Sequence, residues 1–497
     1  MTSELYYEAK RNALPYAAER GHNRTSIEDI DIEHMKTAHI IGVCGTAMAS
    51  LASLLIERGM TVSGSDQACY PPMSTVLEDL HVQVLPFDVK NIEGKDLIIV
   101  GNMCSPVNVE AAYCRDNNIP YFSLGEIIGK LCIGDKKSIV VAGTHGKTTT
   151  TSVAISAFKY ASLNPAYLVG GVMKEDGKSA HYNPDSKYFI IEGDEYDTAY
   201  FDKRPKFLHY KPYVTIITSL ELDHIDIYKD FADYEQAFKY LIEATHKDGV
   251  VIACVDDNNV KILVEKMKDT GAHIITYGKD FDADMKIVAI ETVTEGQKVT
   301  VEYKGKQDTF TTHMFGEYNA LNTVAIYTAA TFLNLDIEKI KESFTTFEGV
   351  KRRQEIYGVK NNVTIIDDFA HHPTAVFKTL KGLRERFPTS NIRAIFEPRT
   401  NTSRAKIFEE EYAHAFSFTN QVYISTPKKK DGYNSDEFMD VEYVAKTISE
   451  QGIPCKAFSD ADEIVAYIKN EIQSGDILVV MSNGDFHGIH AKLLNIL

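Results

Sequence analysis

The chain has 497 residues, 44% of them hydrophobic and 25% charged, which is the composition of a globular protein with room for about three domains. Its formal net charge of −17 argues against a broad surface for nucleic acid or for an anionic membrane, and no apolar run approaches the roughly 18 residues of a membrane span. Residues 1–20 carry charges throughout and lack the apolar region of a secretory signal. We therefore expect a cytoplasmic protein without nucleic-acid partners or membrane insertion.

Seven cysteines are scattered along the chain without any C-x-x-C pair, at positions 44, 69, 104, 114, 132, 254 and 455. An odd and unpatterned set is typical of free thiols in a reducing compartment. The sequence therefore predicts free thiols.

Residues 1–36 are polar and charged and form an N-terminal extension to which no role is assigned. After it, apolar runs alternate with a helix-like stretch, which predicts βαβ units and a parallel sheet. The expected elements are a strand ending at the turn Gly42–Gly45, a helix at 47–58, and strands at 61–66 and 97–100. This first domain is expected to span residues 37–134.

A buried-strand pattern at 138–141 leads into the segment G-T-H-G-K-T-T, and a helix-like stretch follows from 149 to 160. Glycines in such a turn let backbone N–H groups approach phosphate oxygens, and the N-terminus of the helix favours the same anion. The lysine reaches the β- and γ-phosphates and the following threonine hydroxyl suits Mg²⁺. The general phosphate-loop pattern asks for glycine at 141, where this chain has valine. The expected ATP-binding residues here are Gly143, Thr144, His145, Gly146, Lys147, Thr148 and Thr149.

Further strands and helices complete a central domain at 135–349. The expected strands are 188–191, 214–218, 249–253 and 273–276, with helices at 231–247 and 320–333 and antiparallel strands inserted at 285–314. Glu192 follows one strand and His224 follows another, and the strand ends of a parallel sheet meet at one ligand-binding edge. Mg²⁺ prefers oxygen ligands, so Glu192 is a plausible ligand, whereas a lone histidine is more often a surface or core residue.

The turn Gly42-x-x-Gly45-x-Ala47, with Asp66 at the tip of the next strand, is a weak dinucleotide fingerprint. Taken alone it suggests a nicotinamide-dependent oxidoreductase. The phosphate loop in the next domain suggests instead that one nucleotide is consumed while another is carried on the substrate. A phosphate-loop switch protein, which hydrolyses nucleotide without a second substrate, is a further alternative.

The chain becomes basic at 351–353, where we expect a boundary to a third domain at 350–497. Its expected strands are 363–366, 392–396, 422–425 and 477–481. Polar segments follow two of them and belong on a ligand-facing edge. Arg399 and Arg404 are suited to bind carboxylates in a bidentate manner, although loop residues with local capping roles would give the same pattern.

Six separated segments, taken in this order, resemble the Mur ligase family of ATP-dependent amide-forming ligases over about residues 37–497. The segments are Gly42–Met48, Gly143–Thr149, Glu192–Asp197, Asp223–Tyr228, Gly316–Asn322 and Asp367–Pro373. The resemblance implies an α/β protein of three domains. The first is Rossmann-like and binds a UDP-sugar, the central one is of the P-loop ATPase type with a mostly parallel sheet, and the C-terminal one is Rossmann-like and binds the incoming amine substrate.

The resemblance also implies roles for individual residues. Lys147 and His224 would be catalytic, and Thr148, Glu192 and His224 would hold or support Mg²⁺. Further ATP contacts would come from Asn319, Asn322, Arg352 and Asp367. The UDP-sugar would be bound by Gly42, Gly45, Thr46, Ala47, Met48, Ser65 and Asp66, and the peptide by His371, Arg399 and Arg404. Tyr318 stands where the family usually has histidine.

Within the family, the segments resemble the branch that acts on UDP-N-acetylmuramate. Three local features, at 65–74, 195–204 and 397–402, favour ligation to the free murein tripeptide L-alanyl-γ-D-glutamyl-meso-diaminopimelate, by way of an acyl phosphate, in peptidoglycan recycling. The alternative is ligation of UDP-N-acetylmuramate to L-alanine. Asp485 and His487 depart from the pattern of the tripeptide-adding enzymes, at the rim of the expected pocket.

Overall fold

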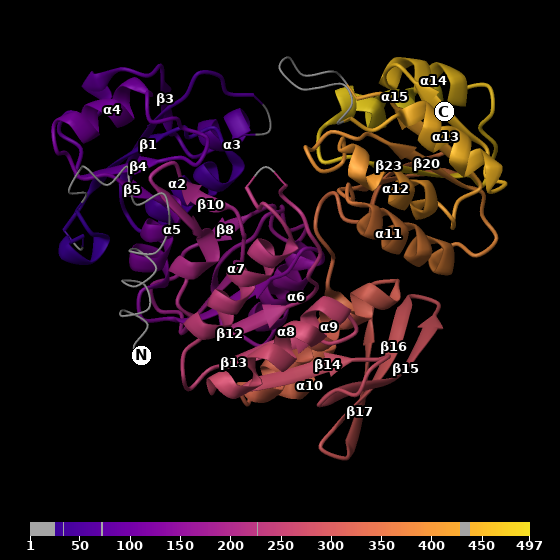
Figure 1. Ribbon diagram of the computed structural model, residues 1–497, viewed down its shortest axis with the longest axis horizontal. Helices are drawn as coiled ribbons and strands as arrows, with labels where there is room; N and C mark the ends of the chain where they lie inside the picture. The colour runs from indigo at the N-terminus through magenta and orange to yellow at the C-terminus, as the bar shows by residue number, and fades with distance from the viewer. Residues whose placement is uncertain (1–24, 33, 71–72, 226, 428–437) are drawn as a thin grey trace. The chain divides into compact units, whose positions relative to one another are not determined.

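The structure is a computed structural model that describes residues 25–32, 34–70, 73–225, 227–427 and 438–497. Most of the expected N-terminal extension therefore lies outside the described residues, as do Pro71, Pro72 and Asp226 of the segments quoted above. The chain divides into two compact units (Figure 1). Unit 1 comprises residues 1–221, 230–286 and 324–343, and unit 2 comprises 222–229, 287–323 and 344–497. In the described ranges, no helix is both long and apolar enough to cross a bilayer.

Unit 1 begins with a five-stranded parallel sheet of order β3-β2-β1-β4-β5. Its strands are β1 (Thr37–Ile41), β2 (Thr61–Ser65), β3 (Gln83–Leu85), β4 (Leu97–Val100) and β5 (Phe122–Ser123). Its helices are α2 (Thr46–Glu57), α3 (Met73–Asp79), α4 (Val109–Asp116) and α5 (Leu124–Ile127), the last continued by a π-helix, Ile128–Ile133. The alternation of strand and helix read from the sequence is confirmed here.

The second sheet of unit 1 runs in the order β14-β13-β12-β6-β9-β7-β8 and is parallel except for the pair β7–β8. Its strands are β6 (Lys137–Ala142), β7 (Ala166–Leu168), β8 (Ala180–His181), β9 (Tyr188–Glu192), β12 (Pro212–Ile217), β13 (Val250–Cys254) and β14 (Ile274–Gly278). Helices α6 (Lys147–Tyr160), α7 (Phe231–Ala244) and α8 (Asn258–Met267) connect them. Strand β6 is central and buried from Ser138 onward, because a parallel strand covered on both faces reads as a continuous apolar run.

A short hairpin joins the two sheets of unit 1. It consists of β10 (Asp197–Ala199) and β11 (Asp202–Pro205), paired antiparallel. At its tip, Tyr200 and Phe201 pack against the core that β1, β4 and α4 form in the first sheet. The ring of Phe201 meets Tyr121 edge to face, with centroids 5.0 Å apart. Part of the first core is therefore supplied by the following part of the chain.

The antiparallel insertion expected at 285–314 is confirmed. Strand β15 (Met285–Val293) is followed in unit 2 by β16 (Gly296–Tyr303) and β17 (Lys306–Thr312), which pair antiparallel along their whole length. Helices α9 (Glu317–Phe332) and α10 (Ile337–Thr346) then follow in the sequence.

The C-terminal part of unit 2 is a six-stranded sheet of order β18-β19-β23-β20-β21-β22, parallel except for the edge strand β18. The strands are β18 (Glu355–Lys360), β19 (Val363–Asp368), β20 (Ile392–Phe396), β21 (Gln421–Ser425), β22 (Cys455–Phe458) and β23 (Ile477–Met481). The helices are α11 (Pro373–Arg386), α12 (Glu409–Ala415), α13 (Val441–Glu450), α14 (Ala461–Ile468) and α15 (Ile489–Ile496).

Helices cover both faces of this sheet. Alternate residues of β23 point into two separate cores, Val479 into one and Val480 into the other, as the two-residue period of a strand requires. The first core contains α11, α12 and α13, and the second contains α14 and α15. Figure 1 shows α11 and α14 on opposite sides of β20 and β23. The α/β architecture predicted from the sequence is confirmed.

Candidate functional site

The turn between β6 and α6 has a backbone that only glycine accommodates at its first position. Gly143 has φ +127°, and a Cβ there would lie 2.4 Å from Thr218 Oγ1 and 2.9 Å from the backbone nitrogen of Ser219. Thr144 N–H donates to the Ser219 carbonyl at 3.0 Å, and His145 N–H donates to the Ser219 hydroxyl at 2.9 Å. The end of β12 thus holds the loop in place, and α6 begins directly after it.

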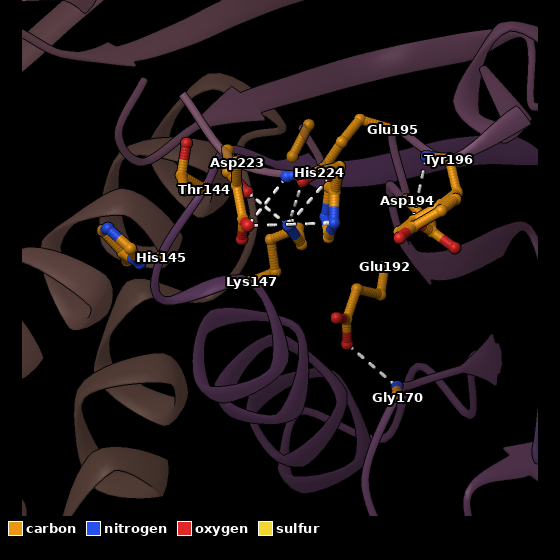
Figure 2. A network of polar contacts seen from close by, with 12 residues as sticks. Thr144, His145, Lys147, Gly170, Glu192, Asp194, Glu195, Tyr196, Asp223 and His224 are labelled. Carbon is orange, nitrogen blue, oxygen red and sulfur yellow. Dashed lines mark hydrogen bonds and ion pairs between the residues drawn. The ribbon is translucent and has the colours of Figure 1, made fainter. Parts of the chain in front are cut away.

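Lys147, the first residue of α6, lies beside a buried carboxylate. Its Nζ is 2.9 Å from each oxygen of Glu195 and donates at 2.6 Å to the Gly143 carbonyl (Figure 2). Burial acts to lower the pKa of Lys147, but Glu195 and Glu192 outweigh it, so the pKa is raised above its usual value. Lys147 is therefore a firmly charged cation at the glycine loop, as phosphate binding requires.

Thr148 and Glu192 bring two oxygen atoms together at the edge of the same loop. Thr148 Oγ1 donates to Glu192 Oε1 at 3.1 Å. Figure 2 shows the other contact of this carboxylate, in which Glu192 Oε2 accepts from the Gly170 N–H at 2.9 Å. A hydroxyl and a carboxylate are ligands that Mg²⁺ prefers, so these residues fit that ion. Asp194 is engaged elsewhere: burial raises its pKa, but the ion pair with Lys206 at 2.6 Å lowers it to about 2.

In the first sheet of unit 1, the glycine turn and the strand tip predicted to bind a UDP-sugar lie side by side. Gly42 N–H donates to the Ser65 carbonyl at 2.8 Å, because β1 and β2 are neighbours in the sheet. Asp66 Oδ2 accepts from the Cys44 N–H at 2.9 Å. The remaining predicted residues come next in the chain. Gly45 is the N-cap of α2, and Thr46, Ala47 and Met48 form the first turn of that helix.

The expectation of free thiols is wrong for two of the seven cysteines. Cys44 and Cys69 form a disulfide that joins the glycine turn to the loop after β2. The five others, at 104, 114, 132, 254 and 455, are free. A spacing of 25 residues gives no sign of this pair in the sequence, because parallel strands β1 and β2 bring the two loops together.

In unit 2, Asn319 and Asn322, which the resemblance assigns to ATP, are neighbours at the start of α9. Both are buried, and Asn322 Nδ2 donates to Asn319 Oδ1 at 3.3 Å. The hydroxyl of Tyr318, the departure from the family pattern, accepts from Gln354 Nε2, and Gln354 N–H donates to Asp368 at 2.8 Å. Tyr318 therefore links α9 to the start of the C-terminal sheet.

Arg352 and Asp367, predicted together at the ATP site, form an ion pair in unit 2. Arg352 Nε is 3.3 Å from Asp367 Oδ2, and Arg352 Nη2 donates at 2.6 Å to the Ser482 carbonyl after β23. His490 from α15 reaches the other Asp367 oxygen at 3.2 Å. Hydrogen bonds of Arg352 to Asp367 on β19 and to the loop after β23 thus hold the pair in place.

His224 lies in the segment 222–229 of unit 2, and its own backbone has φ +55°. Its neighbour Asp223 accepts from the Thr402 hydroxyl at 2.6 Å. Burial raises the pKa of Asp223, but His224, Thr402 and the nearby His371 lower it well below its usual value. Asp223 thus lies near both His224 and His371, and the resemblance assigned the latter to the peptide.

The two predicted peptide-binding arginines follow β20. The Arg399 side chain lies directly against the loop after β23, because a Cβ on Gly484 would be only 1.4 Å from Arg399 Nη1. The same nitrogen lies 4.0 Å from Asp485. Burial lowers the pKa of Arg404, and Arg399 acts in the same direction. The two guanidinium groups therefore share one region at the carboxyl edge of the sheet.

Sequence reasoning missed two residues of the loop site. Glu195 lies within the segment Glu192–Asp197 but has no individual role predicted for it, and Tyr234 lies in the helix expected at 231–247 without any predicted role. The Tyr234 side chain is buried, and its hydroxyl lies 3.1 Å from both Glu195 and Thr144. An aromatic residue on an amphipathic helix is typical of a core position, so its sequence carries no signal of this contact.

Parallel α/β sheets and a lysine-bearing glycine loop beside metal-type oxygen ligands define a nucleotide-binding enzyme. Three family models match successive parts of the chain: the Mur ligase family catalytic domain at 37–135, the Mur ligase middle domain at 141–330, and the Mur ligase glutamate ligase domain at 352–484. The chain belongs to the Mur ligase family, whose members are ATP-dependent acid–amino-acid ligases.

Relatives of both UDP-N-acetylmuramate-specific kinds are similar to this chain. The UDP-N-acetylmuramate–L-alanyl-γ-D-glutamyl-meso-2,6-diaminoheptandioate ligase of Haemophilus influenzae is 33% identical over 93% of this chain and 99% of its own length. The UDP-N-acetylmuramate–L-alanine ligase of Clostridium tetani is 31% identical over 92% and 97%. The solved structure of a murein peptide ligase from Psychrobacter arcticus matches with a TM-score of 0.67 and 29% identity, over 93% of this chain and 98% of that one.

Proposed function

We propose that this protein uses ATP to join the lactyl carboxylate of UDP-N-acetylmuramate to the free α-amine of L-alanyl-γ-D-glutamyl-meso-diaminopimelate, in the recycling of peptidoglycan. The observation that carries the proposal is the likeness, over nearly the full length of both chains, to the Haemophilus influenzae ligase named for that reaction. The lysine held at a glycine loop supplies the cation that the chemistry needs. We place the reaction in the cytoplasm, where ATP is available.

The chemistry has two steps. A carboxylate is a poor acylating agent because its oxide cannot leave, so the lactyl carboxylate first attacks the γ-phosphorus of ATP and ADP departs. The resulting acyl phosphate is attacked by the peptide amine, the amide bond forms, the amine loses its proton, and phosphate leaves. No covalent bond to the protein is needed, so its contribution is positioning and neutralisation of charge.

We assign to Lys147 the contact with the γ-phosphoryl group of ATP. Two anions must approach each other in the first step, and the lysine offsets their repulsion. Thr148 and Glu192 would hold Mg²⁺, which supplies Lewis-acid stabilisation of the phosphate oxygens when bound. The assignment of His224 to the same ion, and to catalysis, stays a prediction.

The other assignments are proposed as the sequence made them. Domains of residues 37–134, 135–349 and 350–497 would bind the UDP-sugar, ATP and the peptide. Asn319, Asn322, Arg352 and Asp367 would complete the ATP site. The UDP-sugar would be contacted by Gly42, Gly45, Thr46, Ala47, Met48, Ser65 and Asp66, and the peptide by His371, Arg399 and Arg404.

A second candidate function is ligation of UDP-N-acetylmuramate to L-alanine, because the Clostridium tetani relative is 31% identical. Incubating the protein with UDP-N-acetylmuramate, MgATP and either the tripeptide or L-alanine, and weighing the products by mass spectrometry, separates the two. Product with the tripeptide alone supports the proposal, and product with L-alanine alone overturns it. Lys147→Ala should abolish ADP release that depends on both substrates; substantial ligation by this variant would contradict the role of Lys147.

A further inference from the structure

Tyr234 on α7 is a buried side chain whose hydroxyl faces polar groups of the phosphate loop. Its ring packs in the core of unit 1, with the Phe238 ring 5.2 Å away. Its Oη lies 3.1 Å from Thr144 Oγ1 and 3.1 Å from Glu195 Oε1. Buried tyrosine hydroxyls require partners, and here both partners belong to the site that holds Lys147.

The Glu195 carboxylate fixes the direction of the hydrogen bond that it shares with Tyr234. The Glu195 carboxylate only accepts, so Tyr234 donates its single proton to it. Thr144 Oγ1 in turn accepts from the Glu221 N–H at 2.8 Å. The hydroxyls of Thr144 and Tyr234 form a chain of contacts that ends at Glu195, and the Thr144 hydroxyl also lies 2.9 Å from the Glu221 carbonyl as a second acceptor. Removing the Tyr234 hydroxyl would therefore take a hydrogen-bond donor from Glu195 and a polar contact from Thr144.

The carboxylate at the end of this chain controls where Lys147 points. Both of its oxygens accept from Lys147 Nζ at 2.9 Å, and Glu195 is completely buried. A change in the Glu195 rotamer therefore moves the ammonium group. The same hydroxyl also contacts Thr144, whose backbone is part of the glycine loop. Tyr234 thus connects the loop backbone to the anchor of the lysine.

We propose that Tyr234 is a positioning residue for nucleotide binding, which holds Glu195 and Thr144 in the geometry that presents Lys147 to the phosphates of ATP. The inference rests on the proposed function in one respect, namely that Lys147 contacts phosphate. It adds a residue from α7, outside every motif recognised in the sequence, to the machinery of the loop.

The decisive variant is Tyr234→Phe, which removes one oxygen and keeps the ring. We expect the KM for ATP and the Kd for a fluorescent MgADP analogue to rise about tenfold, the size expected for losing a hydrogen bond to a charged group. The KM for UDP-N-acetylmuramate should stay within about twofold. Tyr240→Phe, the same change on the same helix, is the matched control and should leave both nucleotide constants unaltered. A fall in Tm of Tyr234→Phe without a change in its nucleotide constants would overturn the proposal.

A second pair of variants tests the chain itself and does not depend on Tyr234 alone. Thr144→Val should weaken nucleotide binding like Tyr234→Phe, whereas Thr144→Ser keeps the hydroxyl and should bind nearly normally. The double variant of Thr144→Val and Tyr234→Phe should be little weaker than either alone, because both break one chain. Fully additive losses would refute the coupling. Nucleotide binding is measured without the acceptor substrates, so a wild-type protein that binds MgADP but fails to ligate would count against the proposed function and not against Tyr234.

Discussion

Replacing Lys147 with methionine tests whether the lysine at the phosphate loop is also a structural cation. The Glu195 side chain is fully buried and that of Lys147 is only 15% exposed. Removing one partner of a buried ion pair leaves the other charge uncompensated, at a cost of about 3–5 kcal/mol. We expect Lys147→Met to lower the free energy of unfolding by that amount. Neutralising both partners, in Lys147→Met with Glu195→Gln, should recover at least about 2 kcal/mol of it, because no lone charge is then buried.

The assay is urea denaturation followed by far-ultraviolet circular dichroism, since the chain has no tryptophan to report on unfolding. The matched control is Lys159→Met on the same helix, whose ion pair with Asp176 is more exposed, at 23% and 28%. Exposed pairs contribute about 1 kcal/mol or less. Equal losses from the two lysine variants, or a double variant no more stable than Lys147→Met, would refute the reasoning.

Three further predictions concern other parts of the chain. Burial raises the pKa of Glu57, but its hydrogen bonds to the His181 side chain and other donors lower it from 4.5 to about 2. The ionised carboxylate therefore stabilises the native state above about pH 4.5, and this stabilisation is lost as the pH falls toward 2. The Tm difference between wild type and Glu57→Gln should shrink over that interval. Gly484→Ala displaces the Arg399 guanidinium, so the KM for the peptide should rise several-fold with the KM for ATP unchanged; equal shifts in both would argue against a peptide role. Thiol titration of the denatured chain should find five thiols before reduction and seven after it, and seven throughout would contradict the disulfide.

The sequence predicted the parts of the fold that depend on local patterns. The predicted bounds of the strand before Gly143 and of the helix after it agree with the structure to within a few residues. Strand burial, glycine turns and helix periodicity are patterns that extend over only about twenty residues of sequence. The Thr148–Glu192 contact also followed, since parallel strands bring their carboxyl ends to one edge.

What the sequence did not predict depends on contacts between side chains distant in the chain. Tyr318 looked like a simple departure from a motif, but it accepts a hydrogen bond from Gln354, which lies 36 positions later. Cys44 and Cys69 lacked any recognisable spacing, yet neighbouring strands bring them into bonding distance. Such pairings depend on rotamers and loop paths, which neither composition nor periodicity specifies.

The aromatic tip of the β10–β11 hairpin has a consequence for how the protein assembles. Tyr200 and Phe201 pack against the N-terminal core. A polypeptide that ends near residue 135 would lack these two rings, and the part of the core that they cover would be exposed to solvent. During synthesis, the packing of the N-terminal core against these rings is completed only after about seventy more residues have emerged. The first sheet and the sheet that carries the phosphate loop therefore complete their packing together.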